Sequence, residues 1–378
     1  MDVPAPRGLL RAFAEMKDPR MNRTKKHNLQ DILAIAICAA ICGADGWSQV
    51  EMFGNCKIKW FKTFLDLPNG IPSHDTFGRV FAMLKPDAFE QCFMNWMKTL
   101  RKISKGQLVA IDGKTIRRSF DTASEKAAIH MVSAWCKSNQ MVLGQIATDE
   151  KSNEIKAIPQ LLKILELDNA VVTIDAMGCQ KKIAAEIVNN NADYILQLKG
   201  NQEAFHKEVI ELFENCLTDD CRGIKYHTAK TINKGHGRIE VRKIVATNEI
   251  EWFAEREKWK NLNSLIRVES QRTVDGKSSK EFRYYISSMA ADEPAELLDY
   301  IRGHWGVENS LHWSLDISFR EDECRIRQGH AAENFSRLNR IALNLLKSET
   351  TCKAGIKSKR LLCGWSHDYL LKVLTQEI

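Results

Sequence analysis

The chain has 378 residues and a formal net charge of +7, with 44% apolar and 27% charged residues. This composition excludes a disordered or low-complexity chain, and the length predicts about two globular domains. The basic balance favours a polyanionic partner. The 11 cysteines are scattered rather than gathered into a disulfide framework, which indicates a reduced, cytoplasmic protein.

Residues 1–100 are predicted to form an all-helical domain. The stretch "HNLQDILAIAICAAICGA" holds an apolar run of about 13 residues, which is too short to span a bilayer and predicts a buried helix. We expect no signal peptide before it. Ser73 is the expected N-cap of a later helix. The segment "KDPRMNRTKKHN" carries five Lys or Arg between residues 17 and 26, and it is either a solvated loop or an arm that contacts phosphates.

From residue 107 the pattern alternates between strands and helices. Strands are expected at "QLVAIDGKTI", at "NAVVTIDAMG" and at "ADYILQLKGN", with a hairpin at "AIHMVSAWCKSNQMVLGQIAT" and helices at "SNEIKAIPQLLKILEL" and "CQKKIAAEIVNNN". This order predicts an α/β domain in which helices cover a mixed sheet. We expect its first part to span residues 105–216.

The rest of the chain, residues 217–378, divides into three predicted parts. Residues 217–291 alternate apolar and polar positions around glycine-containing turns, which predicts an antiparallel β insertion. Residues 292–348 are predicted to be helical and to complete the α/β domain. Residues 349–378 form a basic C-terminal tail.

Two carboxylates follow apolar strands of the predicted sheet. Asp112 stands in "VAIDGK" and Asp175 in "VTIDAMG". In α/β sheets the carboxyl ends of strands open into the crevice where ligands bind, and a charge there is costly unless it is paired or metal-bound. Adjacent strands could therefore bring both carboxylates to one divalent cation. The alternative is that each aspartate only forms a turn.

A third acid is expected in the stretch from residue 299 to 327. On a helical wheel of about 100° per residue, Glu308 falls between Ile301, Leu311 and Leu315, so its side chain is predicted to point towards the core. Such a carboxylate needs a partner, either a metal ion or an arginine at the core edge. The acids expected to face solvent are Glu321, Asp322 and Glu323.

The same helix allows a different metal site. His304, Glu308 and His312 are spaced i, i+4 and i+8, so they could ligate zinc. Against this, the spacing is not the His-Glu-x-x-His pattern of zinc proteases, and it leaves Asp112 and Asp175 without a role.

Five motifs in one order resemble those of a known family. They are "VAIDGKTIRRS", "VVTIDAMGCQKKIA", "YILQLKGNQ", "GHGRIEVR" and "HWGVENSLHWSLDISFREDECRIR". Together they resemble DDE transposases, most closely the H-repeat-associated insertion-sequence group. Residues 8–95 resemble the helical transposase-associated domain of that group.

The resemblance implies a ribonuclease-H-like catalytic core. Two Mg²⁺ ions, for which Mn²⁺ can substitute, would be held by Asp112, Asp175 and Glu308. The implied activity is metal-dependent cleavage of DNA at element ends, followed by strand transfer into target DNA. The long interval before Glu308 fits a subgroup with a β insertion. The sequence departs from the wider clan in one respect, because His304 and Leu315 stand where an arginine and a lysine usually lie near the scissile phosphate.

A set of polar and basic residues near these motifs is expected to contact DNA. The set comprises Lys114, Arg117, Arg118, Lys199, Asn201, His236, Arg238, Arg242, His304 and His312, with Gln202 beside Asn201. For any single cation a solvated surface role is an equal alternative. Trp305 and Trp313 could stack on a flipped base, although core packing is the favoured prediction.

Three functions compete on these observations. The first is an active transposase that works as a homodimer or higher assembly on terminal repeats and target DNA, associated with the nucleoid and not with a membrane. The second is an inactive or domesticated relative that only binds DNA. The third is a nuclease with the same core that performs no strand transfer.

Overall fold

The computed structural model describes residues 11–100, 106–120, 127–148, 153–218, 224–235, 237–251 and 253–375. The chain forms two compact units, each built from separate segments. Unit 1 comprises Met1–Lys102, Gly113–Lys151 and Glu308–Ile378, and unit 2 comprises Ile103–Asp112 and Ser152–Val307. Each unit thus combines pieces of several predicted domains.

Unit 1 is mainly helical. Its helices are α2 (Leu29–Ile41), α3 (Trp47–Phe61), α4 (His74–Met83), α5 (Pro86–Leu100), α10 (Trp313–Ile317), α11 (Ala331–Ser348), α12 (Ile356–Trp365) and α13 (His367–Leu374). It also holds the antiparallel strands β2 (His130–Cys136) and β3 (Met141–Thr148). The predicted apolar helix is present as α2, which begins after the N-cap Asn28 and is buried almost throughout. Ser73 caps α4 as predicted.

Helix α11 forms the core of unit 1 and packs against α2, α4, α5 and β3. Apart from Glu333, every residue from Ala331 to Leu346 is buried, including two arginines. Buried cations need partners. Arg337 Nε lies 2.8 Å from the Glu90 carboxylate of α5, and Arg340 Nη1 lies 2.8 Å from the Glu321 carboxylate. These ion pairs connect distant parts of the chain to one helix.

The predicted basic tail contains two helices, α12 and α13, which the sequence did not indicate. Two of their cations, Lys359 and Arg360, are buried. Lys359 Nζ donates to the carbonyl of Leu346 at 3.0 Å, and Arg360 Nη2 donates to the carbonyl of Ala40 at 2.7 Å. The tail therefore packs against α11 and α2 through its own charges.

Unit 2 is built on a mixed sheet. Its strands are β4 (Val171–Ile174), β5 (Asp193–Leu198), β6 (His227–Gly235), β7 (Arg238–Thr247), β8 (Ser264–Val274) and β9 (Lys277–Ser287), joined by β1 (Leu108–Thr115), which continues into unit 1. The strand order is β3-β2-β1-β4-β5-β9-β8-β7-β6. β1, β4 and β5 are parallel, whereas β9 pairs antiparallel with β5.

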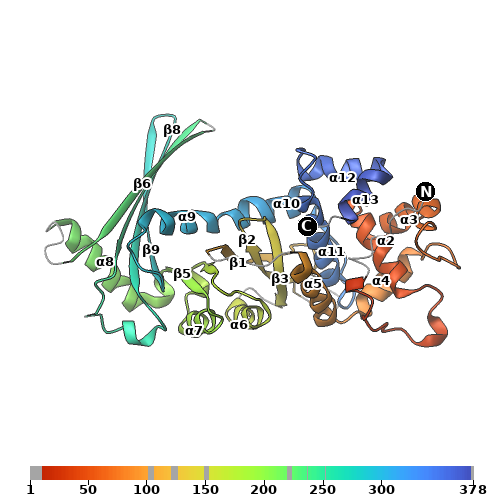
Figure 1. The fold of residues 1–378 in the computed structure, drawn as a ribbon, viewed down its shortest axis with the longest axis horizontal. Coiled ribbons are helices and arrows are strands. Elements are labelled where there is room, and N and C mark those ends of the chain that lie inside the picture. Colours follow the sequence, from red (N-terminus) through yellow and green to blue (C-terminus); the bar gives the residue numbers. More distant parts are fainter. Residues whose placement is uncertain are drawn as a thin grey trace. The chain divides into compact units, whose positions relative to one another are not determined.

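Helices lie on both sides of the parallel strands of unit 2. α6 (Glu154–Ile164) and α7 (Lys181–Asn189) lie on one side of β5 in Figure 1, and α9 (Pro294–His304) lies on the other. α9 buries Leu297, Leu298 and Ile301 against residues of β4, β7 and β8. This arrangement places the C-terminal end of α9 over one face of the sheet.

The predicted β insertion is present as β6–β9, which form a continuous antiparallel meander. α8 (Glu203–Thr218) packs against its base through Phe213, whose ring centroid lies 6.3 Å from that of Tyr284. The hairpin ends extend beyond α8 and α9 (Figure 1). In the described part of the chain, no helix is long and apolar enough to cross a bilayer.

Candidate active site

The strand register brings Asp112 and Asp175 to the same level of the sheet. The parallel pairing of β1 with β4 runs from Leu108↔Val171 to Ile111↔Ile174, so each aspartate is the next residue after the last pair. Neighbouring strands lie about 4.8 Å apart, and residues at the same level point to the same face. Two half-buried carboxylates therefore project side by side from adjacent strands.

Backbone amides fix the Asp175 carboxylate. Its Oδ1 accepts hydrogen bonds from the N–H groups of Met177 at 3.1 Å and Gly178 at 3.4 Å, which closes a short 3₁₀ turn from Ala176 to Gly178. A Cβ on Gly178 would lie 2.2 Å from Cγ2 of Ile174, so this tight turn requires glycine. Asp175 does form a turn, and the turn leaves its charge beside Asp112.

The motif "LKGNQ" braces the same turn. Asn201 Nδ2 donates to the carbonyl of Ala176 at 2.6 Å, and Gln202 Nε2 donates to the carbonyl of Cys179 at 3.1 Å. The amide of Asn201 thus holds the loop that follows β4, and its predicted contact with DNA stays a prediction. Lys199, just before it, has an exposed side chain.

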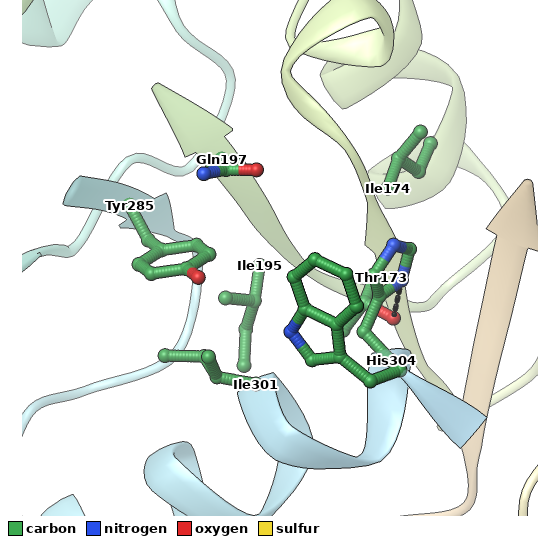
Figure 2. Close-up of a pocket in the computed structure, with 8 residues that line it drawn as sticks. Thr173, Ile174, Ile195, Gln197, Tyr285, Ile301 and His304 are labelled. Carbon is green, nitrogen blue, oxygen red and sulfur yellow. Dashed lines mark hydrogen bonds between the residues drawn. The ribbon is translucent and has the colours of Figure 1, made fainter. Parts of the chain in front are cut away.

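His304 lies on the same face of the sheet as Asp175. Thr173 precedes Asp175 by two residues on β4, and its Oγ1 lies 3.0 Å from Nδ1 of His304 (Figure 2). Burial lowers the pKa of His304 to about 4, although the nearby Asp175 carboxylate acts in the opposite direction. The imidazole is therefore uncharged at neutral pH and offers no ionic attraction to a phosphate. It lines a pocket with Ile174, Gln197 and Trp305.

Glu308 is exposed, contrary to the helical-wheel prediction. It lies in a π-helical segment, Val307–His312, and is the first residue of the last segment of unit 1. The i→i+5 hydrogen bonds of a π-helix advance each residue by less than an α-helix does, so the wheel assigns the wrong direction beyond Val307. The same segment ends the i, i+4, i+8 alignment on which the zinc alternative depended.

The acids after this helix also differ from prediction. Glu321 is buried, and one carboxylate oxygen lies 2.8 Å from both Arg340 Nη1 and Ser336 Oγ. Asp322 contacts Lys114 Nζ at 2.7 Å and Arg117 Nε at 3.1 Å. Of the three acids predicted to face solvent, only Glu323 does.

The predicted DNA contacts fall into distinct environments. Lys114 is buried, and its ammonium lies 2.7 Å from carboxylate oxygens of both Asp316 and Asp322, so it is neutralised by its own chain. Arg242 lies 2.7 Å from Glu240 and is partly buried. The cations with exposed side chains are Arg117, Arg118, Lys199 and Arg238. His312 is half-buried in the π-helical segment, and His236 lies outside the described residues.

Two tryptophans are exposed, although core packing was the favoured prediction. Trp305 is 37% exposed, with the Arg283 guanidinium 4.6 Å from its ring centroid, and Trp313 is 57% exposed.

Sequence reasoning also missed Thr173 and the lysines of β6–β9. Their signal was the two-residue period of a strand, which places Thr173 on the face of Asp175 and Lys230 on the face of Lys234.

Two of the three predicted metal ligands lie in the same unit. Asp112 and Asp175 are neighbours in unit 2, whereas Glu308 belongs to unit 1. Over the described ranges, no three His, Cys, Asp or Glu side chains are placed to share a metal ion. The triad itself stays a prediction.

Comparison with known proteins identifies the family. Residues 103–345 match the family described as Transposase DDE domain, and residues 10–97 match the one described as DDE_Tnp_1-associated. The putative transposase YncI of Escherichia coli O157:H7 is 42% identical over 370 residues, which is 97% of this chain and 94% of the relative. The H repeat-associated putative transposase YhhI of Escherichia coli strain K12 is 40% identical over 372 residues, 97% of each chain. A shorter relative, the inactive transposase YbfQ of strain K12, is 48% identical over 59 residues, 16% of this chain and 70% of the relative.

Proposed function

The chain belongs to the DDE transposases, and from this premise we propose that it cleaves DNA at the ends of an insertion element and joins those ends to target DNA. The observation that carries the proposal is the register of β1 and β4, which brings Asp112 and Asp175 side by side. The mixed sheet, the β insertion and the helical N-terminal region agree with the ribonuclease-H-like fold of the family.

The paired carboxylates suit the metal ions that this family uses. Mg²⁺ prefers oxygen ligands from one or two carboxylates, completed by water and phosphate oxygens. Asp112 and Asp175 would supply two such carboxylates from adjacent strands, and Glu308 would supply the third by its match to the family motif. Two bound Mg²⁺ ions would make the attacking oxygen more nucleophilic and neutralise charge on the leaving oxygen.

The chain's own residues would prepare the site for two successive displacements. Water would attack the phosphodiester at the element end, and the broken P–O bond would leave a 3′-hydroxyl and a 5′-phosphate. That hydroxyl would then attack a target phosphodiester and release a target 3′-hydroxyl. The backbone amides of Met177 and Gly178 would hold Asp175 in place throughout, and the exposed Arg117, Arg118 and Lys199 would contact phosphates.

The test is Mg²⁺-dependent cleavage of labelled element ends by the wild-type chain and by Asp112→Asn. The variant keeps the shape of the side chain but removes its charge, so cleavage should fall by a factor on the order of 10³, while DNA binding survives. Asp87→Asn is the matched control, because Asp87 is an exposed carboxylate on α5.

The same assay separates the competing functions. Joined products support the transposase. Binding without cleavage by the wild-type chain would indicate a silent relative, and cleavage without joining would indicate a nuclease. Undiminished cleavage by Asp112→Asn would remove Asp112 from the site.

A further inference from the structure

The distal part of the β6–β9 sheet has two faces of different character. Paired residues of antiparallel strands share a face, so the register defines each face rung by rung. One face, here called the lysine face, carries Lys230, Lys234, Lys243, Lys280, Ile232, Ile239 and Phe282. The opposite face, here called the arginine face, carries Arg238, Glu240, Arg242 and Arg272.

The lysine face is exposed beyond the point where α8 covers it. α8 packs on Tyr284, one rung closer to the base of the sheet than Phe282. Outward from there, Ile232 is 57% exposed, Ile239 40% and Phe282 42%. Clustered exposed apolar side chains on a soluble domain usually mark an interaction surface.

The charges of this face are compensated only around Glu269. This acid lies 2.9 Å from Lys280 and is the cross-strand neighbour of Lys243, but among the described residues Lys230, Lys234 and Lys243 have no carboxylate within ion-pair distance. Lys230 and Lys243 are direct cross-strand partners, and like charges in that position destabilise a sheet. A bound anion would remove this repulsion.

The arginine face is different because one acid is shared among its cations. The Glu240 carboxylate lies 3.2 Å from Arg238 Nε and 2.7 Å from Arg242 Nη2, and nearby Arg272 helps to lower its pKa. The arginines that the sequence singled out are thus partly neutralised, whereas the lysines behind them are not.

The charge pattern of the lysine face also determines which kind of partner it can bind. A second copy docked face to face would bring the same lysines against one another, because a two-fold interface pairs a patch with itself. A wholly apolar partner would bury three unpaired ammonium groups. A polyanion satisfies them, and Lys230 and Lys234 are about 13 Å apart along the strand, the rise of about four nucleotides.

We propose that the lysine face of β6–β9 binds the phosphate backbone of duplex DNA, with Ile232, Ile239 and Phe282 contacting the sugars between phosphates. The inference rests on the proposed function for its substrate. It assigns the DNA contact of the insertion to the face opposite Arg238 and Arg242.

The experiment measures duplex affinity between about 50 and 200 mM KCl, in the Asp112→Asn background so that no DNA is cut. The test variant combines Lys230→Gln, Lys234→Gln and Lys243→Gln. The matched control combines Lys156→Gln, Lys163→Gln and Lys182→Gln, three exposed lysines of α6 and α7. The slope of log K against log salt should decrease in magnitude by about 2.7 in the test variant, about 0.9 for each lost phosphate contact, and stay unchanged in the control.

Each possible result supports or overturns the lysine face as a DNA-binding surface. An equal slope in the test variant and the control would overturn the lysine face as a DNA site and would point to an acidic protein partner instead. If the chain without lysine substitutions binds no duplex, the proposed function fails first. A charge-conserving variant, Lys230→Arg with Lys234→Arg and Lys243→Arg, should retain the original slope, which separates loss of charge from misfolding.

Discussion

Several carboxylates of unit 1 and the Asp175 carboxylate of unit 2 are held in different ways. In unit 1, Glu90 and Glu321 are buried against arginines of α11, and Asp316 and Asp322 share Lys114. In unit 2, the oxygen of Asp175 is held by two backbone amides, and in the described residues no Lys or Arg lies within ion-pair distance of it. A carboxylate whose charge is matched by an internal cation stabilises a fold. A carboxylate that is only oriented by backbone amides keeps its negative charge available for a ligand.

The largest effect is expected at Asp175, where one substitution removes only the charge and another also removes the hydrogen bonds that orient the carboxylate. Asp175→Asn keeps an oxygen that can accept from Met177 and Gly178 but removes the negative charge. Cleavage should fall by a factor on the order of 10³, about 4 kcal/mol in activation free energy, with an unchanged melting temperature. Asp175→Ala should also lose stability, by about 1 kcal/mol, because the turn loses its cap. If Asp175→Asn cuts normally, Asp175 is only a turn residue.

An intermediate effect is expected where a buried charge loses its partner. Glu321→Gln leaves the Arg340 guanidinium without its neutralising carboxylate in a fully buried position. We expect the free energy of unfolding in urea to fall by about 3 kcal/mol. The rate of cleavage per folded molecule should stay the same. A loss of cleavage without a loss of stability would show that this pair serves the reaction, and the comparison between the units would fail.

The smallest effect concerns Lys114, whose partners are partly solvated. Asp316 and Asp322 are 35% and 24% exposed, so water already screens much of the attraction. Lys114→Gln should lower the free energy of unfolding by about 1–2 kcal/mol. Lys85→Gln, at an exposed position before α5, should leave it unchanged. If Lys114→Gln instead reduces the salt dependence of DNA binding at full stability, Lys114 contacts phosphates as the sequence predicted.

Some of these features could be predicted from the sequence because they depend on local pattern. Apolar runs before Asp112 and Asp175 predicted two strands, and the parallel pairing of these strands brings the two aspartates together, although β1 continues past Asp112 to Thr115. α2 and the β insertion followed from hydrophobic periodicity in the same way. These predictions needed no knowledge of which distant residue would become a neighbour.

The other features depend on contacts that local pattern does not contain. Glu321 was predicted to face solvent because it lies in a run of charges, but its partner Arg340 is on α11, a separate helix. Lys359 and Arg360 were assigned to a basic tail because nothing in the local sequence shows where their acceptors are. These acceptors are backbone carbonyls of other helices. Glu308 was assigned to the core because the wheel assumes an α-helix.

The π-helical segment Val307–His312 also sets the direction of the side chains in α10, which follows it directly. A π-turn accommodates one residue more than an α-turn, so deleting one residue there would restore an α-turn and leave the residues of α10 on the faces they now occupy. Winding every residue of the segment as an α-helix would instead rotate α10 by about 100° around its axis. Trp313 and Ile317, which now face water, would then change direction, and so would the buried Ser314 and Leu315. A single extra residue thus determines which side of α10 is buried and which is exposed.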